Sequence, residues 1–296
     1  MEISLLRYLE KTGEACINNI SQNLGQTSIQ TLAQIAHINS IAPNLIMLED
    51  KKYSLSSHLN WLDLQQIKAL LESQQLTYET IILDSIASTN SYALDNIHTL
   101  KDKTIVSCNW QFAGRGRFER QWLSTIAHDI TVSVIYHFAN DFNLALLPII
   151  SAIAVNRMLK SRNIANKIKW PNDIYAETKK VAGILVENRL SANRNLTVIG
   201  IGLDNFQNWE RNQLLIDLVT NLDNIINEFQ LFGFALIRRE WLDNCLHHNH
   251  QVTIMQNEQK LDSGIHYDLG EHGELILRTN TGIKSYSTSA ISLLID

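Results

Sequence analysis

The stretch that decides the fold is Gln111-Phe112-Ala113-Gly114-Arg115-Gly116-Arg117-Phe118-Glu119-Arg120-Gln121-Trp122. Three arginines lie within six positions here, and two of them alternate with glycines. A guanidinium suits phosphate and carboxylate oxygens, and glycine lets the backbone approach a ligand closely. The pattern predicts a loop that is mobile when free and closes over an anion. A solvated basic loop is the alternative for so short a motif.

The surroundings of this loop exclude two common phosphate-binding motifs. No Gly-Lys-Ser/Thr follows, so it is not a P-loop, and the third glycine of a dinucleotide fingerprint is missing. Thr104–Cys108 predicts a short strand just before the loop. The loop therefore leaves the edge of a sheet, which is a common place for a ligand site.

Composition places the chain among ordinary globular proteins. Its 296 residues allow two or three domains, with 45% hydrophobic and 19% charged residues. A net charge of −5 argues against a chain that is basic throughout and wraps nucleic acid. Cys16, Cys108 and Cys245 lie far apart and predict a reduced, cytoplasmic compartment. The longest apolar run, Leu144 to Val155, is shorter than the roughly 18 residues of a membrane span, so no membrane partner is predicted.

Residues 1–60 predict a small helical module. The apolar spacing indicates helices over Ile3–Leu9, over Ile17–Leu24 and after an N-cap at Thr27, with strands at Leu45–Leu48 and Tyr53–Leu55. The third helix is expected to bury Ile29, Leu32, Ile35 and Ala36. This order is typical of a winged helix-turn-helix.

Charge leaves the role of this module open. No Lys or Arg lies between Lys11 and Lys51, although cationic side chains supply most non-specific affinity for DNA. The third helix instead offers polar side chains that can contact base edges: Gln26, Ser28, Gln30, Thr31, Gln34 and His37. Binding to operator DNA and a role in packing or partner contacts are both compatible with the sequence.

Residues 61–245 predict a mixed region of strands and helices. Strands are expected at Thr80–Leu83, Thr104–Cys108, Ile130–Tyr136, Val181–Glu187 and Thr197–Gly202, and helices at Leu62–Leu71, Leu144–Ser161, Asn212–Phe232 and Phe234–His247. Ser88-Thr89-Asn90 opens a further helix that runs to Ile97. These polar groups could grip a ligand's head group, or they could form a plain N-cap.

A second polar pair stands further along this region. Asp173 and Lys180 are expected at the two feet of a hairpin, where they could face each other across a site. The lysine could neutralise developing charge while the carboxylate orients it or an incoming amine. A surface salt bridge is the alternative. His247, His248 and His250 have no carboxylate or cysteine partner at metal-ligand spacing, so no metal site is predicted.

Residues 246–296 predict a small all-β domain. Short strands recur at Val252–Ile254, Lys260–Leu261, Gly264–Tyr267, Leu275–Leu277, Ile283–Tyr286 and Ser289–Leu294, with glycines between or beside them. Their spacing fits a small barrel.

Four motifs occur together in a fixed order: Ser88-Thr89-Asn90, the Gln111–Trp122 stretch, Lys169-Trp170-Pro171-Asn172-Asp173, and Lys180-Val181-Ala182-Gly183-Ile184-Leu185-Val186-Glu187. In this combination the chain resembles the biotin–protein ligase family, in particular the bifunctional bacterial members that also repress a biotin operon. The resemblance implies an α+β fold. It comprises a winged helix-turn-helix at 1–60, a class II aminoacyl-tRNA synthetase/biotin ligase-like domain with a mixed sheet at 61–245, and an SH3-like β-barrel at 246–296.

The resemblance also implies a two-step reaction. Biotin attacks the α-phosphate of ATP, with Mg²⁺, to give biotinyl-5′-AMP and pyrophosphate. A lysine of the biotin carboxyl carrier protein of acetyl-CoA carboxylase then takes the biotin and releases AMP. Homodimerisation and operator repression are further implications. A lipoate–protein ligase and a protein that is mainly a biotin-sensing DNA-binding repressor are the alternatives.

The family's functional positions can be placed on this chain residue by residue. The resemblance implies catalytic roles for Lys180, Asp173 and Arg115. It implies that biotin is bound by Ser88, Thr89, Asn90, Gln111, Gly114, Arg115, Arg117, Lys180 and Gly183. It implies that ATP or the adenylate is bound by Arg117, Arg120, Trp122, Lys169, Asn172, Lys180, Gly202 and Asp204.

Three features depart from the family pattern. Glu119 stands where the family usually has glycine, and could pair with Arg117 or Arg120. Asp204 replaces the usual asparagine, which puts the adenine contacts of that turn in doubt. The segment after it is short, which leaves Trp209 as the candidate to cover the adenylate.

Overall fold

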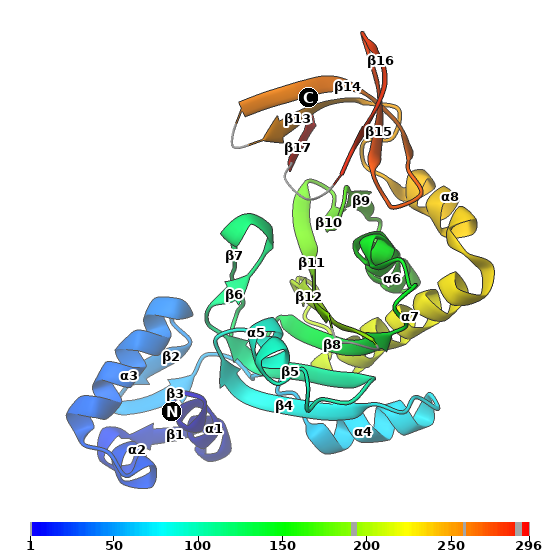
Figure 1. Cartoon of the computed structure of the whole chain (residues 1–296). Helices are drawn as coiled ribbons and strands as arrows, with labels where there is room; N and C mark the ends of the chain where they lie inside the picture. The colour runs from blue at the N-terminus through cyan, green and yellow to red at the C-terminus, as the bar shows by residue number, and fades with distance from the viewer. Residues whose placement is uncertain (1, 191–193, 257–258, 288–291, 296) are drawn as a thin grey trace.

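The computed structural model of the chain describes residues 2–190, 194–256, 259–287 and 292–295. Three β-sheets of three, seven and five strands follow one another along the chain, and a two-stranded ribbon is inserted within the part that forms the seven-stranded sheet. Figure 1 shows the N-terminal module at one end, the C-terminal sheet at the other and the seven-stranded sheet in the middle.

The N-terminal module packs three helices on a three-stranded antiparallel sheet. Its helices are α1 (Glu2–Thr12), α2 (Ile17–Leu24) and α3 (Ser28–Ile41), and its strands lie in the order β1 (Glu14–Cys16), β3 (Lys52–Leu55), β2 (Ile46–Glu49). Gly25 adopts the left-handed conformation that ends α2. The Thr27 hydroxyl then caps α3 by accepting a hydrogen bond from the Gln30 N–H. In return, the Gln30 side-chain oxygen accepts one from the Thr27 N–H.

The buried face of α3 differs from the predicted one. Ile35 is buried as expected, but Ile29 and Leu32 are 80% and 44% exposed. Thr31 and Ile38 are buried in their place. Thr31 tolerates burial because its hydroxyl bonds to Ser21 and to the Thr27 carbonyl. It is therefore not available for contacts with bases, contrary to the prediction.

The central sheet is mixed, which confirms the predicted fold class. Its strands lie in the order β4 (Glu79–Ile86), β5 (Thr104–Gln111), β8 (Ile130–Phe138), β12 (Asn195–Leu203), β11 (Lys179–Leu190), β10 (Asp173–Ala176), β9 (Lys167–Lys169). Only β4 and β5 run parallel among these described strands. Asp173 begins β10 and Lys180 lies near the start of β11, so both belong to one hairpin.

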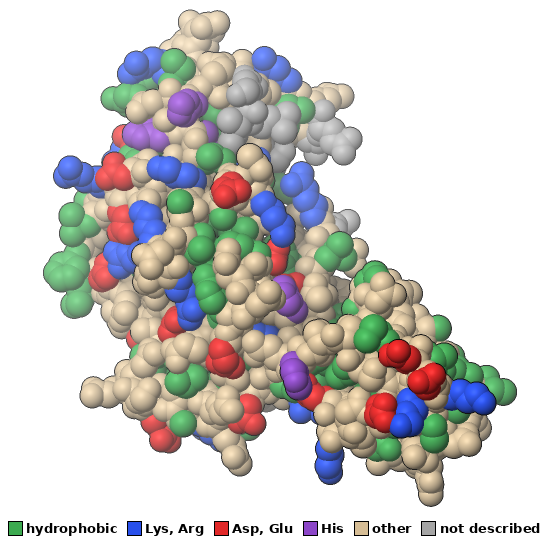
Figure 2. All heavy atoms as spheres, turned by 180° about the vertical axis from the view of Figure 1, so that it is seen from behind, with side chains coloured by type: hydrophobic (Ala, Val, Ile, Leu, Met, Phe, Trp, Pro, Cys, Tyr) green, Lys and Arg blue, Asp and Glu red, His purple; other side chains and the backbone are tan. Residues whose placement is uncertain are grey.

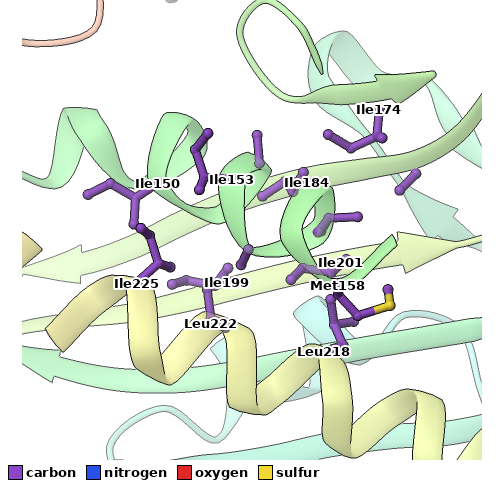
Figure 3. Packing of buried hydrophobic residues seen from close by; sticks show 14 of the residues in the cluster. Ile150, Ile153, Met158, Ile174, Ile184, Ile199, Ile201, Leu218, Leu222 and Ile225 are labelled. Atoms are coloured by element: carbon purple, nitrogen blue, oxygen red, sulfur yellow. The ribbon is translucent and has the colours of Figure 1, made fainter. Parts of the chain in front are cut away.

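Alternate residues of each strand pack on opposite faces of this sheet. On one face α4 (Leu64–Ser73), α6 (Leu147–Ser161) and α7 (Arg211–Phe232) cover residues such as Ile105 and Ile199. On the other face α5 (Thr89–Asp95) covers Val106 and Val198. Figure 3 shows isoleucines and leucines of α6 and α7 meeting the sheet. Burial at this scale is the main force that holds the layers together.

Helix α6 is a largely buried helix with few charged residues. With the preceding turn η2 (Leu144–Leu146) it gives one segment, Leu144–Ser161, that is long and apolar enough to cross a membrane. However, 67% of that segment is buried inside the protein. Its apolarity is explained by its place in the core between the sheet and α7.

The last helix before the C-terminal sheet is shorter than the sequence predicted. Helix α8 (Phe234–Asn244) ends before Cys245, whereas the prediction carried it to His247. A five-stranded sheet follows in the order β16 (Gly282–Tyr286), β15 (Leu275–Thr279), β14 (Gln259–Leu269), β13 (Gln251–Gln256), β17 (Ser292–Ile295). Two predicted strands, at Lys260–Leu261 and Gly264–Tyr267, are joined in β14. Residues 289–291 of the last predicted strand lie outside the described residues.

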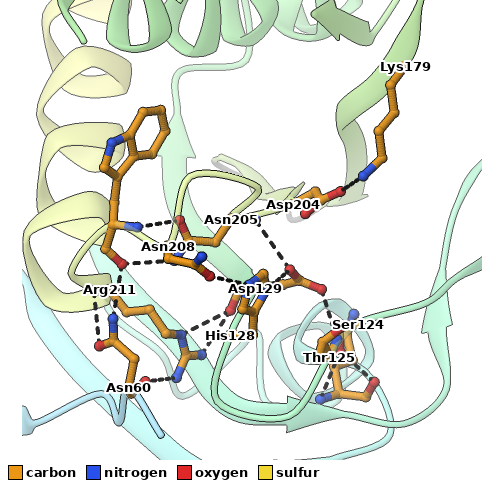
Figure 4. A network of polar contacts seen from close by, with 12 residues as sticks. Asn60, Ser124, Thr125, His128, Asp129, Lys179, Asp204, Asn205, Asn208 and Arg211 are labelled. Atoms are coloured by element: carbon orange, nitrogen blue, oxygen red, sulfur yellow. Dashed lines mark hydrogen bonds and ion pairs between the residues drawn. The ribbon is translucent and has the colours of Figure 1, made fainter. Parts of the chain in front are cut away.

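A buried arginine connects the linker after the N-terminal module to the central sheet. Arg211 is fully buried and donates to the Asn60, Cys108 and Asp129 carbonyls and to the Asn109 side chain. Figure 4 shows the contacts of Arg211 with Asn60 and Asp129, and the network continues from Asp129 to His128 and Asn205. Burial lowers the pKa of Arg211 to about 10, which still leaves it charged near pH 7.

Figure 2 shows the molecule from behind, with the N-terminal module at lower right. On that face of the module, acidic and basic side chains lie side by side, without a continuous basic surface. The domain boundaries at residues 60 and 245 stay predictions.

Candidate functional site

A row of paired residues forms the floor of a cleft on the α5 face of the central sheet. Across five adjacent strands the register pairs Thr131 with Gly202, Gly202 with Gly183, Gly183 with Asp173, and Asp173 with Lys169. Residues paired in this way point to the same face. The register therefore places two glycines between the polar side chains of β8 and those of β10 and β9.

The Gly114–Trp122 segment closes one side of this cleft. It forms a short ribbon of β6 (Gly114–Arg115) and β7 (Gln121–Trp122), with a single turn, η1 (Arg117–Glu119), at its tip. Gly116 N–H donates to the Arg120 carbonyl at 2.6 Å. Gly114 has no room for a side chain, because the Gln111 amide and the Trp122 carbonyl lie against it. The two-stranded ribbon thus carries the arginines over the floor.

Arg115 joins this ribbon to the central sheet. Its guanidinium contacts the Glu187 carboxylate of β11 at 2.8 and 3.1 Å, and its Nε donates to the Ser91 hydroxyl at 3.0 Å. Glu187 also accepts from the Asn90 amide at 3.0 Å. We call these three side chains, Arg115, Glu187 and Ser91, the ribbon latch. It holds the arginine ribbon against the sheet.

The start of α5 supplies a compact group of hydrogen-bonding side chains. Ser88 caps the helix by accepting the Ser91 N–H, and Thr89 donates both its N–H and its hydroxyl to the Gln111 amide oxygen. The Ser133 hydroxyl of β8 lies 2.8 Å from the Thr89 hydroxyl and 2.6 Å from the Asn90 amide oxygen, and it can donate to either of them. A Cβ on Gly200 would overlap the Asn90 amide, so glycine is required there. The N-cap and the predicted polar cluster are therefore the same structure.

Lys180 and Asp173 form a direct ion pair. Their Nζ and Oδ1 atoms are 2.8 Å apart, and the two side chains are 39% and 24% exposed. The register between β10 and β11 shifts between Ile174 and Tyr175, which places Lys180 opposite Tyr175. Both charges line the cleft, so the pair does not lie on the outer surface.

The cleft carries an excess of positive charge. Its described lining includes five cationic side chains, Arg115, Arg117, Arg120, Lys169 and Lys180, and one carboxylate, Asp173. Burial lowers the pKa of Arg117, and the nearby Arg120 lowers it further, while Asp173 raises it. Burial likewise lowers the pKa of Lys169, with Lys180 and Arg120 acting in the same direction. Crowding of like charges in this way is relieved when a polyanion binds.

Trp122 fills part of the cleft floor. A Cβ on Gly202 would overlap the indole, and one on Gly183 would approach it to 3.3 Å. The buried indole N–H of Trp122 has no described hydrogen-bond partner. The remaining cleft has a volume of about 190 Å³, below the roughly 300 Å³ of a small ligand site. A nucleotide-sized ligand therefore needs more room, and both the indole and the arginine ribbon border the space that it would enter.

Most of the predicted site residues meet in this one cleft. Its lining includes Ser88, Thr89, Asn90, Gln111, Arg115, Arg117, Arg120, Trp122, Lys169, Asn172, Asp173, Lys180, Gly183 and Gly202. Asn172 accepts from Arg117 at 3.3 Å and donates to the Ile184 carbonyl at 2.6 Å. The loop, the helix start and the hairpin are thus parts of one site.

Other predicted positions lie outside the lining. Gly114 supports the ribbon from behind, and Asp204 pairs with Lys179 at 2.5 Å. Trp209 packs on Phe206 and under Arg162, away from the cleft lining. The Glu119 side chain lies outside the described side chains, so its predicted pairing stays untested.

Four residues that build the site were not predicted: Ser91, Thr131, Ser133 and Glu187. Glu187 belongs to a quoted motif but had no assigned role, and Ser133 was simply part of an alternating strand. A carboxylate at the end of an apolar strand is the one signal that could have singled out Glu187. No signal in the sequence singles out Ser133.

A polar helix start beside a glycine-floored cleft with five cations defines an enzyme site for a ligand that combines a small polar head with a phosphate-rich tail. Comparison with known proteins agrees with this class. Residues 82–204 match the family described as the Biotin/lipoate A/B protein ligase family. That segment contains the start of α5, the arginine ribbon and the Lys180 strand. Residues 82–204 therefore form a domain of this ligase family.

Individual relatives cover more of the chain. The chain is 28% identical to the bifunctional ligase/repressor BirA of Escherichia coli, over 92% of each protein. It is 27% identical to the biotin–[acetyl-CoA-carboxylase] ligase of Paracoccus denitrificans, over 66% of this chain and 92% of that one. A solved biotin protein ligase from Aquifex aeolicus, in complex with biotin and ATP, is similar in fold. It has a TM-score of 0.63 and 24% identity, over 74% of this chain and all of that one.

Proposed function

We propose that this ligase is a biotin–protein ligase, of the biotin–[acetyl-CoA-carboxylase] ligase type, that uses ATP. The observation that carries the proposal is the cleft itself, where five cations surround a single carboxylate beside a cluster of head-group donors and acceptors. The printed names of the relatives support biotin as the substrate. A lipoate–protein ligase is the enzymatic alternative within the same family.

In the first step a biotin carboxylate oxygen attacks the α-phosphorus of ATP, and the bond to pyrophosphate breaks. Ser88, Thr89, Asn90 and Gln111 would hold the polar head of biotin, while Arg117 and Arg120 attract the phosphates. Lys180 would stabilise negative charge as it builds on the acyl and phosphate oxygens. The residues mostly hold the two reactants together, which alone supplies a large part of the rate.

In the second step the ε-amine of a carrier lysine attacks the acyl carbon of biotinyl-5′-AMP. The new amide forms, AMP leaves with the electrons of the broken acyl–oxygen bond, and the amine loses a proton. Asp173 is the carboxylate of the cleft lining, and we assign it the orientation of Lys180 and of the incoming amine. The biotin carboxyl carrier protein of acetyl-CoA carboxylase is the proposed acceptor.

Mg²⁺ fits this site as a companion of ATP. Magnesium commonly takes one or two carboxylates together with substrate phosphates, and the cleft offers Asp173 and the Asn172 amide oxygen. It would supply neutralisation of phosphate charge.

Pyrophosphate exchange tests the proposal. Purified protein should incorporate labelled pyrophosphate into ATP when biotin is added and should not do so with lipoate. Exchange with lipoate alone would assign the chain to the alternative activity. Absence of exchange with either acid would remove the adenylation step altogether.

We further propose that residues 1–60 are a winged helix-turn-helix and that 246–296 are an SH3-like domain. Three helices with a three-stranded sheet, and five short antiparallel strands, support these assignments. The printed name of the Escherichia coli relative supports operator repression as a second activity. Cytoplasmic location and a homodimer stay predictions.

A further inference from the structure

The segment after α8 lies beside the edge strand β9. Leu246 N–H donates to the Ile168 carbonyl at 2.8 Å, and Cys245 pairs with Ile168 in a parallel bridge. The next donor along β9 is the Trp170 N–H, which reaches the Nε2 atom of His247 at 3.0 Å. If residues 245–247 continued to pair with this strand, a backbone carbonyl would accept the Trp170 N–H. The His247 imidazole accepts it instead.

This contact fixes the position of the proton on each of two buried histidines. Because Nε2 of His247 accepts, its proton resides on Nδ1 in the neutral ring. That Nδ1 lies 3.1 Å from Nδ1 of His266, which must then accept. His266 carries its own proton on Nε2, which donates to the Asp268 carbonyl at 3.0 Å. A directed chain of three hydrogen bonds runs from Trp170 to β14.

A metal ion is the competing explanation for this cluster. Ligand atoms of Cys245, His247 and His266 all lie within 4.8 Å of one another, and all three residues are buried. However, a metal on Nδ1 of His247 would move the ring proton to Nε2, where it would face the Trp170 N–H. Histidines that bind metals normally donate their second N–H to an acceptor. The hydrogen-bond chain gives every ring nitrogen a partner. A metal site would instead leave two donors, the Nε2–H of His247 and the Trp170 N–H, facing each other.

We propose that His247 is a positioning residue for the Lys169–Asp173 segment of the active site. Trp170 is 3% exposed and lines the cleft, and its indole N–H also bonds to the Gly273 carbonyl, at 3.0 Å. Both N–H groups of Trp170 are therefore held by residues C-terminal to α8. Lys169, Asn172 and Asp173 flank this anchor in the chain. The two connecting segments that carry His247 and Gly273 thereby set the placement of cationic and acidic groups in the cleft.

The environment keeps both rings neutral, as the chain of bonds requires. Burial, together with the nearby His266, Lys169, His250 and His248, lowers the pKa of His247 to about 2. Burial lowers the pKa of His266 to about 4, although the Asp268 backbone and carboxylate act in the opposite direction. Near pH 7 neither ring carries the second proton that would break the chain.

Nitrogen-15 spectra of the histidine rings test the bond directions directly. In full-length protein labelled at histidine, we expect His247 as the Nδ1–H tautomer and His266 as the Nε2–H tautomer, assigned from the His247→Gln and His266→Asn variants. One equivalent of Zn²⁺ should leave both sets of signals unchanged. An Nε2–H tautomer for His247, or a shift of these signals with Zn²⁺, would overturn the proposal. This measurement does not depend on any activity.

Kinetics then test the positioning role, and this arm rests on the proposed function. His247→Ala should lower kcat/KM for ATP in biotin-dependent exchange about tenfold, the effect of one lost hydrogen bond. His247→Gln, whose amide oxygen can accept from Trp170, should recover most of this loss. His250→Ala, at an exposed neighbouring position, is the matched control. All variants would be assayed well below their measured unfolding temperatures.

The outcomes separate the two ideas. An equal loss in His247→Ala and His247→Gln, or no loss in either, would remove the positioning role. Wild-type protein without any exchange, but with the expected tautomers, would count against the proposed function alone.

Discussion

Lys180 is the residue to which the proposed mechanism assigns the stabilisation of developing charge. The bulge in β10–β11 turns it toward Asp173 and the cleft, and its Nζ lies 5.7 Å from the centre of the Trp122 ring. An ammonium placed where charge develops contributes through the transition state, whereas it adds little to the fold. We expect Lys180→Ala to lower the rate of biotinyl-adenylate formation by about 10²- to 10³-fold. Single-turnover assays with labelled ATP would measure this.

The neighbouring lysine provides the control for that change. Lys179 is 67% exposed and pairs with Asp204 outside the cleft. Lys179→Ala should therefore keep its rate within about twofold, because exposed pairs contribute little. The unfolding temperature of both variants should stay close to that of the wild type. Near-normal turnover in Lys180→Ala would remove Lys180 from its role.

At the scale of residues, the sequence indicated which side chains belong to the site better than it indicated which contacts they make. The resemblance of the motifs to a known family pointed to Lys180, Asp173 and the Ser88–Asn90 cluster, whereas their spacing alone left a surface salt bridge and a plain N-cap open. They could not show that Glu187 holds Arg115, since that contact joins positions 72 residues apart. Pairing of this kind depends on strand register, which is set by the whole sheet.

The arginine ribbon carries three of the five cationic side chains of the cleft, Arg115, Arg117 and Arg120. Among its described contacts, the ribbon latch ties it to β11 and α5 through the Arg115–Glu187 pair. Glu187→Gln keeps the shape of the side chain but removes the charge. We expect faster tryptic cleavage after Arg115, Arg117 or Arg120 in the ligand-free protein, by about two- to fivefold. An exposed charged pair of this kind contributes up to about 1 kcal/mol, which sets that range. Timed digestion followed by mass spectrometry would measure it.

A second acidic residue allows a matched comparison. Glu177 stands in the turn between β10 and β11 and is exposed. Glu177→Gln removes the same charge from a position outside the ribbon latch, so its digestion should match that of the wild type. If both variants were cleaved at the wild-type rate, the latch would not control the ribbon. Saturating biotin and ATP should protect the wild-type ribbon if the proposed function is correct.

Helices and strands with a strong hydrophobic periodicity were predicted well. Bounds and buried faces that depend on contacts with other segments were predicted poorly. The apolar helix α6 and the strands β8 and β12 followed from spacing alone. Helix α3 shows the limit, because a threonine with two hydroxyl contacts replaced the expected apolar face. The early end of α8 is a similar case, since residues 245–247 bond to β9, which lies far away in the sequence.

For the whole molecule, the buried histidines connect stability to pH. In an unfolded chain histidine titrates near pH 6.5, whereas burial lowers the pKa of His266 to about 4 and that of His247 to about 2. Between these values the unfolded chain binds protons that the folded protein does not. The free energy of unfolding should therefore fall as pH drops from about 6.5 to about 4, by up to about 1.4 kcal/mol per pH unit for each histidine.

Urea unfolding at pH 7.5 and pH 5 would measure this effect. His266→Asn should show a smaller difference between the two pH values than the wild type, although its stability at pH 7.5 should also be lower. His250→Ala, which changes an exposed histidine, should keep the wild-type difference. An unchanged pH dependence in His266→Asn would mean that other groups cause it.

The N-terminal module raises the remaining question about the whole molecule, namely whether it binds DNA without a ligand. Arg7 is paired with Asp84 and Lys52 with Glu14, so two of its few cations are already engaged. The exposed face of α3 presents Ile29 and Leu32 where a DNA-binding helix would benefit from positive charge. We expect little binding of the unliganded protein to an operator upstream of biotin genes, no tighter than about 10⁻⁶ M at physiological salt.

A designed charge makes this prediction sharper. Ile29 is 80% exposed, so Ile29→Lys adds a cation to α3 without disturbing the core, and Ile29→Gln is the neutral control. The lysine variant should bind operator DNA and unrelated DNA more tightly, and by a similar factor. The slope of log K against log salt concentration should become steeper by about one released counterion. Gel shifts over a range of salt concentrations would measure both quantities. Nanomolar binding by the unliganded wild type would contradict the expectation, because it would require base contacts strong enough to act without phosphate neutralisation. Tight binding only after biotin and ATP are added would instead indicate that the ligase site controls repression.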